Sequence, residues 1–310
     1  MLRSASRVLA LPALSVLLAL SLLVVGCGSA GTSSDPGQGK LEVVAAENFW
    51  GSIAKQLAGE KASVQSIIVN PGTDPHSYEP TAQDARTMAG AKLAIVNGLD
   101  YDNWATKLLD ASPLGGRVVL NVGDLLGLGQ GENPHQWYSP GNVERVIQQI
   151  AADYSKLDPA DATYFTQRRQ AFETHGLAEY NRLRQQIRAR YARVAVGYSE
   201  SIFQPLGADL GLKLITPYSF AKAIAEGTDV TAQDKQTVDA QLQDHQVKVW
   251  VFNSQNVTPD VKRLNQIAAE AQIPIATVTE TLAPASANFE QWQVAQLKGM
   301  MAALHKATGR

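Results

Sequence analysis

The sequence is poor in cysteine, and this limits how its fold can be held together. Cys27 is the only cysteine among 310 residues, so an intramolecular disulfide is excluded. The chain also lacks an excess of one charge, because 27 Lys and Arg residues stand against 29 Asp and Glu residues and leave a formal net charge of −2. Such a chain has no basic stripe to neutralise phosphates, so nucleic acid is not expected as a partner.

Two sequence signatures of hydrolytic enzymes are also lacking. No His-Glu-x-x-His run occurs, and this pattern supplies two zinc ligands and a general base in metalloproteases. The Gly-x-Ser match Gly197-Tyr198-Ser199 does not continue into a nucleophile elbow. We therefore do not expect an enzyme, and a zinc-dependent hydrolase remains the alternative.

The first residues have the layout of an export signal. Two arginines precede an apolar run over residues 8–25, which ends beside a Gly-Cys pair. The residues Val-Val-Gly-Cys at 24–27 resemble the bacterial lipobox, in which the cysteine is acylated and becomes the new N-terminus. We therefore predict a signal peptide over residues 1–26 and a lipid on Cys27. An uncleaved membrane anchor is the alternative, because the apolar run is close to the roughly 18 residues of a spanning helix.

The next segment is predicted to be a tether. Residues 27–40 comprise the cysteine and a stretch rich in Gly and Ser, which is too poor in apolar side chains to pack. A flexible segment of this length has a typical reach of about 20 Å. That reach suits a domain that must dock on a membrane protein.

Two sets of short apolar segments alternate with helical patterns in the rest of the chain. This alternation is typical of parallel sheets. The expected strands are 41–46, 64–69, 93–97 and 118–122 in the first set, and 194–198, 212–215, 247–252 and 275–278 in the second. We predict an α/β fold with two similar lobes, at residues 41–157 and 192–310. Each lobe is expected to have a four-stranded, mainly parallel sheet and a hydrophobic core of its own.

One long helix is predicted between the lobes, over residues 158–191. Asp158 can cap it, Pro159 fits its first turn, and no other proline interrupts it. About 33 helical residues would extend about 50 Å. This length exceeds one lobe and predicts a rigid strut that runs past both lobes. The alternative is a surface helix folded in two at Gly176.

Residues that can bind a metal follow four of the expected strands. In open α/β sheets, ligands bind beyond the carboxyl ends of the strands. His76 and His135 lie in proline-stiffened loops after the second and fourth strands. Glu200 and Glu280 follow the first and last strands of the second lobe. Together, at strand ends that face one cleft, they predict a metal site. The other three histidines stand among polar residues and are expected at the surface: His175, His245 and His305.

These segments resemble the four ligand loops of the zinc- and manganese-binding solute-binding proteins of ABC transporters. The matching stretches are Asp74-Pro75-His76-Ser77-Tyr78-Glu79-Pro80, Asn133-Pro134-His135-Gln136-Trp137, Ser199-Glu200 with Phe203, and Thr279-Glu280-Thr281. The resemblance implies that His76, His135, Glu200 and Glu280 bind Mn²⁺ or Zn²⁺ as transported cargo. It also implies a monomer that is anchored by its lipid at the outer face of the cytoplasmic membrane and delivers the metal to an ABC permease with its cytoplasmic ATPase.

The chain differs from the family pattern at several positions that affect which metal the site prefers. The third ligand is commonly histidine in zinc-type members and glutamate in manganese-type members, so Glu200 favours manganese. The fourth is more often aspartate, and Glu280 is longer by one methylene. Asn253 stands where the family often has an acidic residue, and the long His-rich loop of zinc-specific members is lacking.

A surface adhesin is the second alternative function, beside the zinc-dependent hydrolase.

Overall fold

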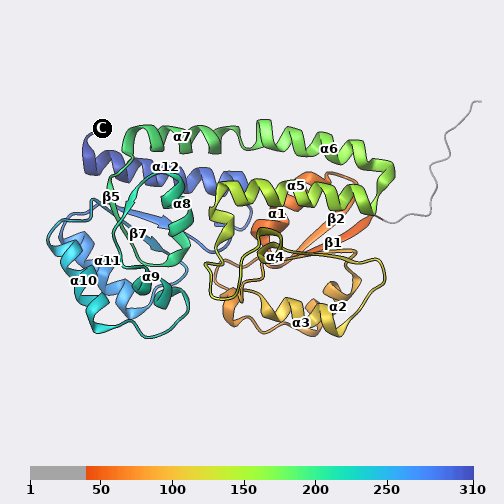
Figure 1. Cartoon of the computed structure of the whole chain (residues 1–310), viewed down its shortest axis with the longest axis horizontal. Coiled ribbons are helices and arrows are strands. Elements are labelled where there is room, and N and C mark those ends of the chain that lie inside the picture. Colours follow the sequence, from red (N-terminus) through yellow and green to blue (C-terminus); the bar gives the residue numbers. More distant parts are fainter. Residues whose placement is uncertain (1–39) are drawn as a thin grey trace, which may run out of the picture. The chain divides into compact units, whose positions relative to one another are not determined.

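The computed structural model describes residues 40–310, so the predicted signal peptide, the lipidated Cys27 and nearly all of the tether lie outside the described residues. Within that part of the chain, the strands form two separate four-stranded sheets (Figure 1). The first sheet contains β1 (Leu41–Glu47), β2 (Ala62–Ile68), β3 (Leu93–Val96) and β4 (Val118–Asn121). The second contains β5 (Ala195–Tyr198), β6 (Lys213–Leu214), β7 (Val249–Asn253) and β8 (Ile275–Val278).

The two sheets have the same topology. Their strand orders are β2-β1-β3-β4 and β6-β5-β7-β8, and every neighbouring pair is parallel. All eight expected strands are present, so the predicted α/β fold with two similar lobes is confirmed. Because all strands of a sheet run the same way, their carboxyl ends and the loops that leave them lie at one edge.

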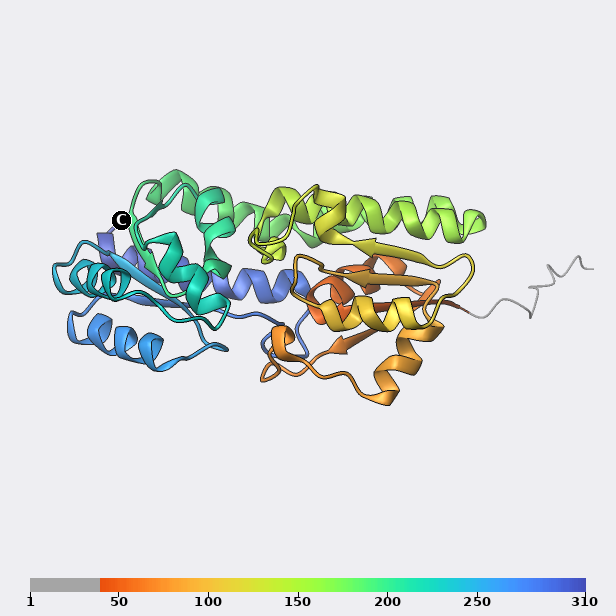
Figure 2. The same ribbon diagram turned by 60° about the horizontal axis from the view of Figure 1, so that its bottom comes forward.

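Helices connect the strands and lie on both sides of each sheet (Figure 2). In the first lobe they are α1 (Asn48–Ala58), α2 (Ala82–Gly90), α3 (Asn103–Ala111), α4 (Val122–Leu126) and α5 (Pro140–Leu157). In the second lobe they are α8 (Gln204–Asp209), α9 (Tyr218–Ala225), α10 (Ala232–Gln243), α11 (Pro259–Glu270) and α12 (Phe289–Thr308). Several begin at a side-chain cap, as in α2, where Thr81 and Asp84 form a reciprocal capping box.

The segment between the lobes is helical but not one uniform α-helix. It begins with the 3-10 turn η3 (Pro159–Asp161), continues as α6 (Ala162–Ala171), forms the π-helical turn η4 (Phe172–Gly176) and ends as α7 (Ala178–Tyr191). Figure 1 shows α6 and α7 running in the same direction past both lobes, so the alternative of a helix folded in two is wrong.

The π turn lies where the sequence predicts a weak point, at Gly176. A Cβ atom at this position would lie 2.6 Å from the ring of Phe172. The ring is buried, and only glycine leaves room for it against the helix backbone. The widened turn therefore lets the strut continue while a large side chain points into the core.

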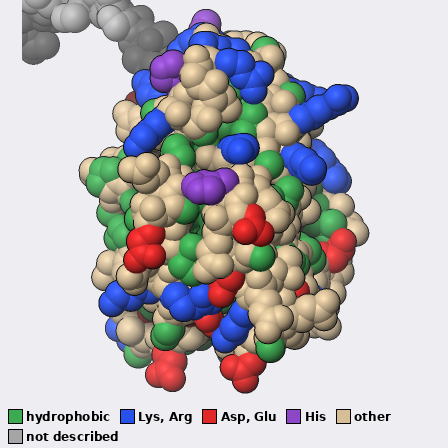
Figure 3. Space-filling view, turned by 90° about the vertical axis from the view of Figure 1, so that its left-hand side faces the viewer, with side chains coloured by type: hydrophobic (Ala, Val, Ile, Leu, Met, Phe, Trp, Pro, Cys, Tyr) green, Lys and Arg blue, Asp and Glu red, His purple; other side chains and the backbone are tan. Residues whose placement is uncertain are grey.

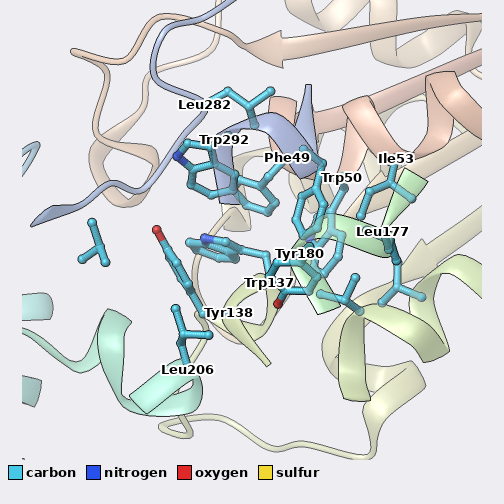
Figure 4. Close-up of a cluster of buried hydrophobic side chains, with 14 of the residues drawn as sticks. Phe49, Trp50, Ile53, Trp137, Tyr138, Leu177, Tyr180, Leu206, Leu282 and Trp292 are labelled. Atoms are coloured by element: carbon cyan, nitrogen blue, oxygen red, sulfur yellow. The ribbon is translucent and has the colours of Figure 1, made fainter. Parts of the chain in front are cut away.

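The largest cluster of buried apolar side chains runs through both lobes, which adds a shared core to the separate core that was expected in each lobe. It includes residues of α1, η2 (Gln136–Tyr138), the strut, β5, α8 and α12. Figure 4 shows part of this shared core, with side chains of the first lobe, the strut and the second lobe in contact: Phe49, Trp50, Ile53, Trp137, Tyr138, Leu177, Tyr180, Leu206, Leu282 and Trp292. Smaller clusters, one confined to each lobe, complete the packing.

The surface of the second lobe carries charges of both signs. Figure 3 shows Lys and Arg side chains gathered mainly towards the top of this end, with Asp and Glu side chains in its lower half. The three histidines that were expected at the surface are exposed: His175, His245 and His305. Within residues 40–310, no helix combines the length and the apolar character needed to cross a membrane.

Candidate metal centre

Three of the four predicted ligands meet between the two lobes. Glu200 follows β5, Glu280 follows β8, and His135 comes from the first lobe, immediately before η2. The exposed fractions of these residues are 0% for His135, 2% for Glu200 and 7% for Glu280. One potential ligand atom of each residue lies within 4.8 Å of those of the other two. The parallel sheets produce this convergence because the carboxyl ends of their strands face the same space.

A loop residue fixes the orientation of the His135 ring. The Nδ1 atom lies 2.6 Å from the side-chain oxygen of Asn133, and the backbone N–H of His135 donates to the same oxygen at 3.1 Å. Because an amide oxygen only accepts, Nδ1 carries the proton and Nε2 carries the lone pair. Nε2 lies 3.8 Å from Glu200 Oε1 and 3.5 Å from Glu280 Oε2. The nitrogen that can bind a metal therefore faces both carboxylates.

The Asn133 amide is itself oriented by the second lobe. Its Nδ2 group donates to the backbone oxygen of Ser201 at 2.8 Å and to the side chain of Gln204 at 3.1 Å. A backbone oxygen cannot donate, so the oxygen of Asn133 must face His135. Contacts of this kind behind a ligand hold it in place and raise its metal affinity. The hydrogen bonds also tie a first-lobe ligand to the second lobe.

Burial makes the site unfavourable for uncompensated charge. Burial lowers the pKa of His135 to about 4, so its imidazole is neutral at physiological pH. Burial, together with the charge of Glu280, raises the pKa of Glu200 well above its usual range. Burial also raises the pKa of Glu280 to about 7. A divalent cation would therefore stabilise this site, because it would compensate the charges of two carboxylates that are shielded from water beside a neutral imidazole.

The fourth predicted ligand, His76, lies in the 3-10 turn η1 (Pro75–Ser77). Its side chain is outside what the structure describes. Its neighbours Asp74 and Ser77 line a cavity of about 360 Å³ that Glu280 also lines. The loop that carries His76 therefore forms a wall of the same cleft, and the role of His76 as a ligand stays a prediction.

The sequence reasoning missed Tyr101, which contacts the site from the first lobe. Its hydroxyl donates to Glu280 Oε2 at 3.0 Å, and the residue is buried. Tyr101 lies in the loop after β3, so a search of every strand end would have found it. The carboxylate of Asp102 accepts the backbone N–H groups of Asn97 at 2.6 Å and Gly98 at 2.8 Å, which anchors this loop.

Asn253 is the second residue whose part in the site the sequence did not reveal. It ends β7, is fully buried, and donates to both Glu200 and Glu280. In the sequence it is visible only as an amide at a position where related proteins often have an acid. The hydrogen bonds to both carboxylates place it directly behind the site.

The donor set matches a site that holds a transition metal. Imidazole nitrogen suits zinc and other transition metals, and carboxylate oxygen suits both zinc and manganese. The protein supplies ligands from both lobes, so a cation bound here would join them. The arrangement is chemically equipped to capture a divalent cation.

Comparisons with known proteins agree with this geometry. A profile of the family described as "Zinc-uptake complex component A periplasmic" (ZnuA) matches residues 43–303. The manganese-binding lipoprotein MntA of Halalkalibacterium halodurans is 31% identical over 161 residues, which are 51% of this chain and 53% of the relative. The chain spans about half the length of the first curated relatives that it matches.

Solved structures show the same fold along nearly their whole length. The Mn-bound periplasmic metal-binding protein of Candidatus Liberibacter asiaticus superposes with a TM-score of 0.71 at 21% identity, covering 84% of this chain and 98% of that protein. The periplasmic zinc-binding protein TroA of Treponema pallidum gives a TM-score of 0.71 at 20% identity, covering 87% and 99%.

Proposed function

The chain belongs to the family of the periplasmic zinc-uptake complex component A, and from this premise we propose that it is the solute-binding component of an ABC importer for a divalent metal. The observation that carries the proposal is the meeting of His135, Glu200 and Glu280, all buried, from both lobes. Capture between two lobes is what an importer needs, because the cargo is enclosed in transit, and a modest rocking of the lobes about the strut would release it.

The proposed cargo is Mn²⁺ or Zn²⁺, held by His76, His135, Glu200 and Glu280. Two imidazoles and two carboxylates can surround zinc tetrahedrally, or manganese with bidentate carboxylates. Relatives named for manganese binding and for zinc binding support both metals. Members of this family are solute-binding proteins and not enzymes, and neither the hydrolase nor the adhesin alternative receives support.

The proposed partners follow from this function. A solute-binding protein delivers its cargo to a membrane permease that is driven by an ATPase, and the chain is proposed to do so as a monomer. The lobes at 41–157 and 192–310, joined by 158–191, would present their cleft to the permease. A lipid on Cys27 would hold the protein at the outer face of the cytoplasmic membrane, as in the relatives named lipoproteins.

Substitution of Glu200 tests the metal site directly. Glu200→Ala removes one ligand, so binding of both metals should weaken. Glu200→His replaces a hard oxygen with a softer nitrogen, so zinc binding should persist or strengthen while manganese binding weakens. Metal that binds only the folded protein raises its melting temperature with the logarithm of concentration over Kd. Thermal shifts of the purified protein with each metal therefore give the comparison.

Glu270→Ala is the matched control, because Glu270 is an exposed glutamate on α11. This variant should retain wild-type thermal shifts with both metals. Wild-type shifts in Glu200→Ala would show that Glu200 is not a ligand. The absence of any shift in the wild-type protein with either metal would contradict the proposed function itself.

Substitution of Cys27 tests the anchor. Cys27→Ser removes the thiol that is acylated, so the protein should move from the membrane fraction to the soluble or secreted fraction. Fractionation of cells followed by immunoblotting measures the distribution. Ser29→Ala, a neighbouring change that spares the cysteine, should leave the protein in the membrane fraction. Cys27→Ser protein that stays in washed membranes would contradict the lipid anchor.

A further inference from the structure

Asn253 joins the two carboxylates of the site through one amide group. Its Nδ2 atom donates to Glu200 Oε2 at 3.0 Å and to Glu280 Oε1 at 2.7 Å. The residue is fully buried at the end of β7, which lies between β5 and β8 in the sheet. It therefore stands between the strands that deliver the two glutamates.

The orientation of the Asn253 amide is determined by its surroundings. Its oxygen accepts the backbone N–H of Gln255 at 3.0 Å. A backbone N–H only donates, so the NH₂ group must point to the carboxylates. The backbone N–H of Asn253 donates to Ser199 Oγ at 3.2 Å, which holds the end of β7 beside the start of the Glu200 loop. Both amide hydrogens are thus committed to the two carboxylates.

The amide divides the four carboxylate oxygens into two kinds. Glu200 Oε2 and Glu280 Oε1 accept from Asn253. Glu200 Oε1 and Glu280 Oε2 are the oxygens that lie nearest to His135 Nε2. A metal beside His135 therefore meets the oxygen of each glutamate that Asn253 does not hold. One of these two, Glu280 Oε2, also accepts a hydrogen bond from the hydroxyl of Tyr101.

We propose that Asn253 limits each glutamate to one metal-binding oxygen and so biases the site towards zinc over manganese. This inference rests on the proposed function. Two imidazoles and two single oxygens make four ligands, the number that zinc takes in closed sites. Manganese is favoured by more oxygen ligands, which bidentate carboxylates would supply. Asn253 would thus act as a positioning residue that opposes the preference for manganese expected from Glu200.

A purely structural role for Asn253 makes a different prediction. If the amide only provided hydrogen bonds to two buried carboxylates, its loss would lower the affinities for both metals by the same factor. The site would loosen without changing its number of ligands. If Asn253 restrains the second oxygens, its loss frees them for bidentate binding, and the affinities for the two metals change by different factors.

The test compares Kd values for Mn²⁺ and Zn²⁺, measured by competition with a chelating dye. We expect Asn253→Ala and Asn253→Ser to lower the ratio of the manganese Kd to the zinc Kd at least about tenfold, because both lose the double donor. Asn265→Ala is the matched control, since Asn265 is an amide of the same lobe that accepts a hydrogen bond from Trp250 of β7 at 2.7 Å. The ratio of the manganese Kd to the zinc Kd in Asn265→Ala should equal that of the wild-type protein.

X-ray absorption of the metal-loaded wild-type protein gives a second readout that does not depend on the folding of any variant. We expect zinc with four nitrogen and oxygen neighbours and with one oxygen from each glutamate. Bidentate carboxylates in the zinc-loaded wild-type protein would overturn the proposal, as would an unchanged or higher Kd ratio in folded Asn253 variants. Wild-type protein that binds neither metal would instead overturn the proposed function, and the inference with it.

Discussion

Replacement of His135 by alanine is expected to abolish measurable binding of both Zn²⁺ and Mn²⁺. His135 is fully buried, and its Nε2 atom lies within 4 Å of an oxygen from each glutamate. Loss of a residue that only supports a ligand typically costs ten- to a hundredfold in affinity, so loss of the ligand itself should cost more than about a hundredfold. Two carboxylates would then face each other without the central imidazole. Isothermal titration with each metal measures the loss.

His175→Ala is the control for this prediction, because His175 is an exposed histidine of the strut. Its metal affinities should match those of the wild-type protein. The two variants separate a specific ligand from a general effect of removing imidazole. A His135→Ala protein that binds either metal within about threefold of the wild-type affinity, which corresponds to less than about 1 kcal/mol, would exclude His135 as a ligand.

Trp137→Ala is expected to cause the largest loss of folding stability among single changes near the site. The Trp137 ring is fully buried and stacks on Phe49, with ring centroids 4.0 Å apart. It also contacts the His135 ring, at a centroid distance of 5.2 Å. Removal of a buried tryptophan side chain lowers the free energy of unfolding by about 3–5 kcal/mol. In a chain of this size the melting temperature should fall by about 10 °C, which calorimetry of the metal-free protein measures.

Two further variants identify the cause of this loss. Within residues 40–310, the indole N–H of Trp137 has no hydrogen-bond partner. Trp137→Phe therefore removes only volume and should cost less than Trp137→Ala. Tyr218→Ala removes an aromatic ring that is 42% exposed and should change the melting temperature little. Equal losses in Trp137→Ala and Tyr218→Ala would show that the ring does not contribute to the core as the structure indicates.

The sequence predicts the framework of this fold because its strands are short apolar runs between helical patterns. All eight strands are found, and the loops after β5 and β8 place Glu200 and Glu280 beside His135. These predictions depend on local patterns and on one rule of topology, that ligands bind beyond the carboxyl ends of parallel strands. A single sequence is sufficient to recognise the local patterns and to apply the rule of topology.

Features that depend on contacts between distant segments could not be predicted in this way. The hydrogen bond from Tyr101 to Glu280 joins residues 179 positions apart in the chain. The double donation by Asn253 depends on the order of three strands in the sheet. The π turn at Gly176 depends on where the Phe172 ring finds space. In each case the deciding factor is packing between elements, and the local sequence pattern does not record it.

The core that runs from the first lobe through the strut into the second bears on how long the molecule survives outside the cytoplasm. Loss of packing in one lobe removes contacts from the other, because the largest cluster of buried side chains serves both. Cleavage within this shared core by a protease should therefore follow the small population of molecules in which the core has opened. A metal bound at the proposed site would reduce that population. Starvation for the metal would thus shorten the lifetime of the protein that collects it.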